Sequence, residues 1–271
     1  MNSDPARELP KPIVERCPII EQTWLNETYF KIRILTADIA QNAYPGQFVN
    51  VRVNETYDPL LRRPLSIYLA NPEAGWVELL IKRVGRGTDL LSRLKVADQI
   101  DVLGPLGRGF DIETVETALL VGGGVGIAPL VFLTRELSLF AKKIYFFQGF
   151  RNEKEVCCLD DLASMDVSPV IATDDGSYGK KGLVTDAVRE FLRSSGNQSG
   201  IELFACGPQP MLKEASTMAD TYNLNWQFSL ETRMACGIGA CMGCAIPSFD
   251  GEDYKLVCKD GPVFRNREVL L

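Results

Sequence analysis

The sequence predicts an antiparallel β-domain, then an α/β-domain, then a short C-terminal segment rich in glycine and cysteine. Short β-rich runs fill residues 12 to 112, and strands alternate with helical stretches from 115 to 230. Four of the eight cysteines lie in the last 36 residues. A chain of 271 residues with 46% hydrophobic residues is long enough to form two cores.

The first region predicts a small antiparallel barrel or sandwich over residues 1–113. Its runs YFKIRIL, QFVNVRV, LSIYLAN and WVELLIKRV alternate with turns such as PG, NPEAG and GPLG. Closely spaced strands rich in β-branched and aromatic residues, with turn signals between them, are typical of all-β domains.

The second region, residues 114–229, predicts a parallel sheet with helices on both faces. The strand-like runs TALLVGGG, KKIYFFQGF, SPVIATDD and IELFACGP are each followed, directly or after a loop, by helical stretches such as PLVFLTRELSLF and GLVTDAVREFLRSS. Alternation of strand and helix indicates βαβ units and therefore a parallel sheet.

The last segment, residues 230–271, has too few apolar residues for a core of its own, and its cysteines predict a metal cluster. Four residues separate Cys236 from Cys241, two separate Cys241 from Cys244, and thirteen separate Cys244 from Cys258. This is the plant-type ferredoxin spacing for a 2Fe–2S cluster with four thiolate ligands. Structural zinc is the alternative, but zinc sites usually have two short cysteine knuckles, whereas this segment has one.

Three other stretches predict phosphate binding. In LLVGGGVGIAPL a glycine-rich turn at Gly122, Gly123, Gly124 and Gly126 joins a strand to a helix, where a dinucleotide pyrophosphate can bind. In the first domain Arg63 and Ser66 of LLRRPLSIY lie near the start of a strand, and VGRGTDLL begins a helix. The two first-domain stretches are explained equally well without a ligand, by an exposed arginine beside a threonine that caps a helix.

Composition excludes several functions. There is no histidine, so Ser-His-Asp hydrolases and His-ligated metals are excluded, and a cofactor is expected to carry any chemistry. The formal charge of −6 without a basic stripe argues against nucleic acid as a partner. Residues 1–18 mix charges with prolines and contain no signal peptide, and glycines and Pro129 interrupt the longest uncharged run, so we expect a cytoplasmic protein without membrane spans.

The order of five motifs along the chain resembles that in the electron-transfer subunit of NAD-linked, heteromeric dihydroorotate dehydrogenase, within the ferredoxin reductase superfamily. These motifs are RRPLS, GRGT, GGGVGIAP, CGP and ETRMACGIGACMGC. The similarity covers nearly the whole chain. It implies a six-stranded antiparallel flavin-binding barrel, a Rossmann-like NAD(P)-binding domain and a 2Fe–2S segment.

The resemblance also implies site residues. FAD would be held by residues of the flavin signature, the second FAD strand and the phosphate turn, namely Arg63, Pro64, Leu65, Ser66, Leu80, Ile81, Lys82, Gly87 and Thr88. NAD(H) would be held by the glycine turn and the CGP turn, namely Gly122, Gly123, Gly124, Gly126, Cys206, Gly207 and Pro208. Cys236, Cys241, Cys244 and Cys258 would bind the cluster. No residue is assigned as an acid or base catalyst.

The implied function is electron transfer in pyrimidine biosynthesis. An FMN-containing catalytic subunit would oxidise dihydroorotate to orotate, and electrons would pass singly through the cluster to FAD and then as hydride to NAD⁺, in a heterotetramer of two plus two chains. The sequence departs from many ferredoxin reductases at Leu65, where they have an aromatic residue, and it lacks their C-terminal aromatic cover over the flavin.

Other readings remain open from the sequence. The same cofactor motifs suit a paralogous subunit that serves another partner, such as the small subunit of NADH-dependent ferredoxin:NADP oxidoreductase, a sulfhydrogenase-type subunit or another FMN reductase. The first of these replaces one cluster cysteine with aspartate, whereas four cysteines are present here. A non-catalytic zinc- or redox-sensing module is a third reading. Arg151 follows the second strand of the α/β-domain and would suit NADPH, while the resemblance favours NADH.

Overall fold

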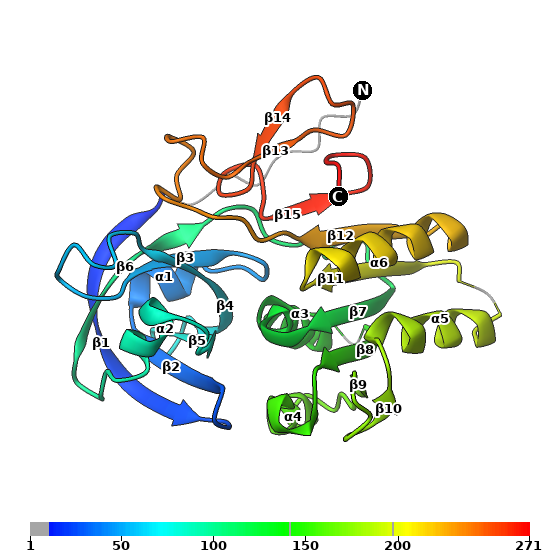
Figure 1. Cartoon of the computed structure of the whole chain (residues 1–271), viewed down its shortest axis with the longest axis horizontal. Helices are drawn as coiled ribbons and strands as arrows, with labels where there is room; N and C mark the ends of the chain where they lie inside the picture. The colour runs from blue at the N-terminus through cyan, green and yellow to red at the C-terminus, as the bar shows by residue number, and fades with distance from the viewer. Residues whose placement is uncertain (1–10, 141, 197) are drawn as a thin grey trace.

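The computed structural model describes residues 11–140, 142–196 and 198–271. The stretch in which no signal peptide is expected lies mostly in residues 1–10, outside the described residues. The chain folds into a barrel and a sheet domain that lie side by side, with the C-terminal segment across the top of both in Figure 1.

The N-terminal domain is a closed six-stranded antiparallel barrel, which confirms the prediction. The strands follow the order β1-β2-β5-β4-β3-β6 around it. Their bounds are β1 Ile13–Trp24, β2 Tyr29–Leu35, β3 Phe48–Arg52, β4 Arg63–Asn71, β5 Trp76–Lys82 and β6 Gln99–Leu106. Alternate residues such as Ile32, Val49 and Leu79 fill the interior, as the two-residue period of a strand requires. Two short helices, α1 (Ala37–Asn42) and α2 (Arg86–Leu91), lie in its connections.

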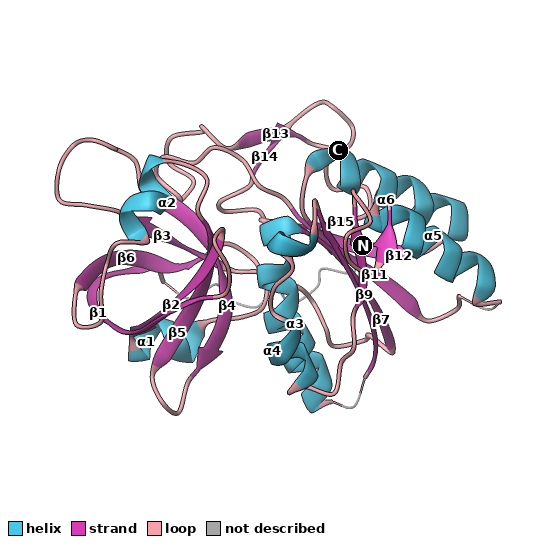
Figure 2. Cartoon of the chain, turned by 60° about the horizontal axis from the view of Figure 1, so that its bottom comes forward, coloured by secondary structure: helices cyan, strands magenta, loops and turns pink. Residues whose placement is uncertain are grey.

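The second domain contains the predicted parallel sheet. It is built from β7 Thr117–Gly123, β8 Lys143–Phe150, β9 Val170–Thr173, β10 Lys180–Lys181, β11 Ile201–Cys206 and β12 Asn225–Ser229, in the order β10-β9-β8-β7-β11-β12. Helices α3 (Ile127–Leu139) and α4 (Leu159–Ala163) lie between sheet and barrel, and α5 (Val184–Ser194) and α6 (Gln209–Tyr222) cover the opposite face (Figure 2). Short 3₁₀ turns, η1 (Gly124–Gly126) and η2 (Glu153–Glu155), follow β7 and β8.

The C-terminal segment is joined to both domains. Its strands β13 (Ala245–Pro247) and β14 (Tyr254–Leu256) form a small hairpin, and β15 (Val263–Arg265) pairs antiparallel with β12 as the seventh strand of the sheet. Its apolar residues, including Leu256 and Phe264, pack with Phe48 and Leu106 of the barrel. The segment therefore shares its core with the barrel, in line with its low apolar content.

Ion pairs and a tyrosine hydroxyl connect the barrel to the sheet domain. Lys31 and Tyr68 on the barrel contact the carboxylate of Asp161 on α4, at 3.2 Å from Lys31 Nζ and 2.5 Å from the Tyr68 hydroxyl. Lys82 Nζ lies 3.0 Å from Glu155 Oε2 in η2. Because these groups are largely shielded from water, removing one partner leaves an uncompensated charge, so the contacts fix the relative position of the two domains.

None of the helices in the described part of the chain is long and apolar enough to cross a membrane.

Candidate functional site

A cavity of about 230 Å³, here called the barrel cavity, opens between the barrel and the start of α3. Seven of the nine residues predicted to hold FAD line it: Pro64, Leu65, Ser66, Leu80, Ile81, Lys82 and Thr88. They come from β4 and β5, which are neighbouring strands in the barrel, and from the short helix α2. Apolar walls with a few hydroxyl and ammonium groups are the usual lining of a site for a flat organic cofactor.

The other two predicted residues, Arg63 and Gly87, lie together beside this cavity. A methyl group added at Gly87 would stand 3.0 Å from Cζ of Arg63, so glycine is needed there for the guanidinium to pack against α2. Arg63 donates to the carbonyl of Leu61 at 2.6 Å. Thr88 accepts hydrogen bonds from the N–H groups of Val84 and Gly85 at 3.0 and 3.2 Å, so its hydroxyl also caps α2.

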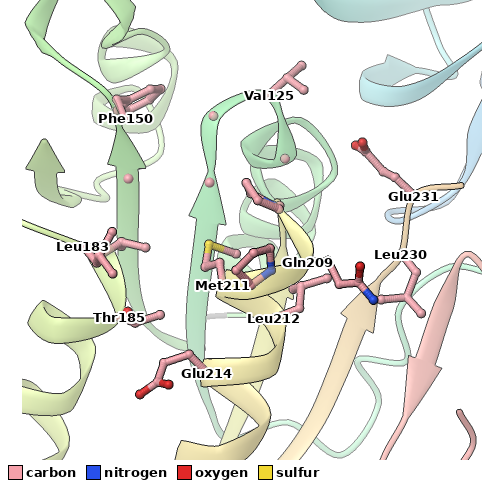
Figure 3. A pocket seen from close by; sticks show the side chains of 18 of the residues that line it. Val125, Phe150, Leu183, Thr185, Gln209, Met211, Leu212, Glu214, Leu230 and Glu231 are labelled. Atoms are coloured by element: carbon pink, nitrogen blue, oxygen red, sulfur yellow. The ribbon is translucent and has the colours of Figure 1, made fainter. Parts of the chain in front are cut away.

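A larger cavity of about 940 Å³, the sheet-edge cavity, lies at the carboxyl ends of the parallel strands. Gly123, Gly124, Gly126, Gly207 and Pro208 line it, and all five were predicted to hold NAD(H). In Figure 3 the first turn of α6 and the loop after β12 face this hollow, with Met211, Leu230 and Glu231 among the side chains shown. The carboxyl edge of such a sheet is where open α/β folds bind ligands.

The two remaining predicted residues lie behind the wall of the sheet-edge cavity. A methyl group at Gly122 would stand 2.7 Å from Cγ2 of Ile127, so Gly122 allows the first turn of α3 to pack on β7. Cys206 is fully buried, and burial raises the pKa of its thiol. A methyl group at Gly126 would clash with the backbone of Cys206 and Gly207, so these two turns pack directly on each other.

Charged groups of both signs line the sheet-edge cavity. Arg189 is paired with Asp186 at 2.7 Å and with Glu214. Arg151 and Asp174 also line the cavity, so the arginine that would suit a 2′-phosphate shares it with a carboxylate.

Glu231 lines both cavities and was not singled out from the sequence. Glu231 is exposed, but the protein atoms around its carboxyl group remove part of its hydration, and this desolvation raises the pKa of Glu231. Lys82 lines both cavities as well. The only sequence signal for Glu231 was its place at the start of the ETRMACGIGACMGC motif.

Three of the four predicted cluster cysteines lie in the loop after β12, and Cys258, which follows the β13–β14 hairpin, interacts with Cys236 and Cys244. The thiols of Cys236 and Cys241 interact with each other, and those of Cys258 and Cys244 form a second pair. In the part of the chain that the structure describes, no group of three or more His, Cys, Asp or Glu side chains is placed to hold a metal ion. The single short knuckle, Cys241 and Cys244, fits a 2Fe–2S cluster better than a structural zinc ion, whose sites usually have two knuckles.

Backbone N–H groups point at these sulfurs. Ile238 and Ala240 donate to Cys236 Sγ at 3.4 and 3.3 Å, and Gly239 donates to Cys258 Sγ at 3.1 Å. Desolvation opposes ionisation of Cys236, but backbone N–H groups and the Cys241 thiol outweigh it and lower the pKa of Cys236 to about 6. Burial and the neighbouring Cys244 raise the pKa of Cys258 to about 12. Gly237 and Gly239 have φ of +74° and +82°, which lets the loop turn its N–H groups inward.

Comparisons with known proteins match all three regions. Family profiles match an "Oxidoreductase FAD-binding domain" at residues 17–110, an "Oxidoreductase NAD-binding domain" at 120–217 and an "Iron-sulfur cluster binding domain of dihydroorotate dehydrogenase B" at 231–270. The chain is 42% identical over 236 residues to the dihydroorotate dehydrogenase B (NAD(+)) electron transfer subunit of Desulforamulus reducens, covering 86% of this chain and 89% of that one.

The chain belongs to the family of dihydroorotate dehydrogenase B electron transfer subunits. A second member, from Geobacillus thermodenitrificans, is 39% identical over 268 residues and covers 95% of this chain and 98% of its own. A solved structure of an NADH-dependent reduced ferredoxin-NADP oxidoreductase superposes with a TM-score of 0.84 at 33% identity, covering 94% of this chain and 89% of that one. The electron transfer subunit of this family thus has FAD-binding, NAD-binding and iron–sulfur regions, as the sequence predicted.

Proposed function

We propose that this chain passes electrons between an FMN-containing dihydroorotate dehydrogenase subunit and NAD⁺, through a 2Fe–2S cluster and FAD, in pyrimidine biosynthesis. One observation carries the proposal: the barrel cavity adjoins both other sites. Phe48 and Met234 line it and pack in the same apolar cluster as Cys244 and Cys258. On its other side, Val125, Lys82 and Glu231 line it together with the sheet-edge cavity.

The residues around the barrel cavity would hold FAD. Leu65, Leu80 and Ile81 would provide the apolar walls, Ser66 and Lys82 would provide polar groups for the flavin, and Arg63 beside Gly87 would provide positive charge for the diphosphate. When bound, FAD exchanges two electrons with a nicotinamide and one at a time with an iron–sulfur centre. The chain's own task is to hold these partners in contact and to keep water out, as its buried walls allow.

The turns at the sheet edge would hold NAD(H). Gly123, Gly124 and Gly126 leave the backbone at the start of α3 open to the sheet-edge cavity, and Gly207 with Pro208 forms the facing wall. Because both turns are anchored to each other through Gly126, the nicotinamide would meet a fixed surface next to Glu231 and Val125. Asp174 lines the same cavity, and its carboxylate would oppose a 2′-phosphate near it, which supports NADH over NADPH.

The cluster cysteines would face the partner subunit. Cys241 is exposed, and beside it Ile238 and Met242 are 52% and 56% exposed. Apolar side chains exposed around a thiolate site support docking of another protein, because their burial favours association and excludes water from the electron path. We further propose a heterotetramer of two such chains with two FMN subunits, located in the cytoplasm.

Purification of the native complex through this chain tests the proposal. Reduction of NAD⁺ by dihydroorotate, with an FMN subunit co-purifying, is the expected result. The likeness to the NADH-dependent reduced ferredoxin-NADP oxidoreductase favours a second candidate, a subunit that serves another partner. NADH oxidation with artificial acceptors, no reaction with dihydroorotate and a different co-purifying protein would favour that candidate.

A further inference from the structure

Asn50 is a buried polar residue on the outer face of the barrel. Its neighbours Val49 and Val51 point into the barrel core, so Asn50 and Phe48 face outward, toward the C-terminal segment. The residue is 1% exposed, and neither Nδ2 nor Oδ1 has a hydrogen-bond partner among the described protein groups.

A buried amide of this kind is costly. A side-chain amide can make up to four hydrogen bonds, and leaving a buried one unpaired destabilises the folded protein. The strand around Asn50 is nevertheless well held. Arg62 donates to its backbone carbonyl at 3.2 Å and pairs with Asp101 at 2.7 Å. The amide is therefore presented at a defined position, although a leucine would fill the same space without the penalty.

The amide faces the first turn of the cluster loop. A methyl group added at Gly237 would collide with Nδ2 of Asn50, and Gly237 directly follows Cys236. The same strand carries Phe48, which lines the barrel cavity, and Asn50 is paired in register with Pro64 of β4. Asn50 thus lies between the proposed flavin site and the cluster cysteines, and Figure 1 shows the segment after β12 passing over this side of the barrel.

We propose that Asn50 is a positioning residue of the iron–sulfur site, whose side-chain NH₂ donates a hydrogen bond to a cluster sulfur. This rests on the proposed function only in that a 2Fe–2S cluster occupies the four cysteines. The bond adds to those from the backbone N–H groups of Ile238, Gly239 and Ala240. Hydrogen bonds to the sulfurs favour the reduced, more negative cluster, so Asn50 raises the reduction potential and eases electron transfer from the partner.

The test is the reduction potential of the cluster in the full-length, cluster-loaded protein, followed by electron paramagnetic resonance during a redox titration. Asn50→Leu should lower the potential, by a shift corresponding to roughly a tenfold change in the reduction equilibrium, which is about 59 mV for one electron. Asn50→Ser, which is smaller but keeps a donor, should shift it less.

Gln47→Leu is the matched control. Gln47 is also buried on the barrel, but its amide is satisfied by protein groups, since it donates to the carbonyl of Gly107 at 2.9 Å and accepts from the N–H of Tyr44 at 2.9 Å. This variant should lose stability yet keep the wild-type potential.

An unchanged potential in iron-loaded Asn50→Leu would overturn the assignment. Loss of iron from both Asn50 variants alone would show that Asn50 holds the cluster loop in place without tuning the cluster, and loss from all three would show that any buried amide of the barrel acts alike. Either result would also overturn the assignment. The potential can be measured even if the complex does not oxidise dihydroorotate, because it requires only the bound cluster. Failure of the proposed function is therefore distinguishable from failure of the Asn50 assignment.

Discussion

The packing of the two nucleotide-site turns predicts a specific defect for Gly126→Ala. A methyl group at Gly126 would stand 2.6 Å from the carbonyl carbon of Cys206 and 2.7 Å from Cα of Gly207, and nearer still to the Cys206 carbonyl oxygen. Ordinary contacts begin at 3.4 Å, and the nearest of these atoms is the carbonyl oxygen, so the two turns must separate by about 1 Å. All of these atoms belong to the backbone, and no side-chain rotation can relieve the clash.

Overpacking of this kind costs about 1–3 kcal/mol of folding stability. The larger effect is expected on function, because a displacement near 1 Å in a reacting pair can slow the reaction on the order of 10²-fold. Since α3 and β11 carry the turns that would hold the nicotinamide nucleotide, NADH should reduce the bound FAD roughly 10- to 100-fold more slowly. FAD content and the visible spectrum of the cluster should stay unchanged.

Anaerobic rapid mixing with NADH, following flavin absorbance, measures this rate. Gly251→Ala serves as the control. Gly251 lies in the β13–β14 turn with φ of +75° and open space around it, so alanine there strains the backbone without touching the nucleotide turns. If Gly126→Ala accepts hydride from NADH at the wild-type rate, the direct packing of the two turns does not shape the site.

Three further changes test the remaining sites. Cys241→Ser should leave reduction of FAD by NADH intact but stop transfer to the partner subunit, and a full dihydroorotate-to-NAD⁺ rate in the purified variant complex would refute the electron path. Arg63→Ala removes a charged hydrogen-bonding group worth about 1.5–3 kcal/mol, so FAD should bind at least about tenfold more weakly, and undiminished FAD occupancy after gel filtration would refute the assignment. The pKa of Glu231 is raised in the folded protein, so its charged form lowers the folding stability. This loss is absent below the ordinary pKa of 4.5 and develops as the pH rises through the pKa of the folded state. Glu231→Gln should therefore gain thermal stability over wild type as the pH is raised from about 5 to about 8, and a margin that shrinks over that range would contradict the sign of the shift.

The barrel and the parallel sheet were predictable because their signals are local. Two-residue alternation in segments such as YFKIRIL and the strand-to-helix change after TALLVGGG depend only on neighbouring residues, and β2 (Tyr29–Leu35) coincides with its predicted run. The cysteine spacing was informative for the same reason. Cys236, Cys241 and Cys244 lie within nine residues and therefore stay close in space, whereas the β13–β14 hairpin returns the chain to them at Cys258.

Contacts between distant segments were not predictable. Nothing in the sequence near Val263 indicates that β15 joins the sheet beside β12, because that pairing depends on how the segment crosses the barrel. Asn50 sits in the apolar run QFVNVRV and carries no motif, so only its burial against Gly237 reveals it. Gly122 and Cys206 belong to glycine-rich or small-residue turns, yet they support the cavity wall from behind, a distinction that requires the packing of α3 on β7.

The most direct test of the account follows the redox centres of the assembled complex after anaerobic addition of dihydroorotate without NAD⁺. Absorbance and electron paramagnetic resonance together distinguish flavin from the 2Fe–2S cluster. The account predicts that dihydroorotate reduces the cluster and the FAD of this chain, and that added NAD⁺ then reoxidises both. Reduction confined to the FMN of the partner subunit, with the cluster and FAD unchanged, would contradict it.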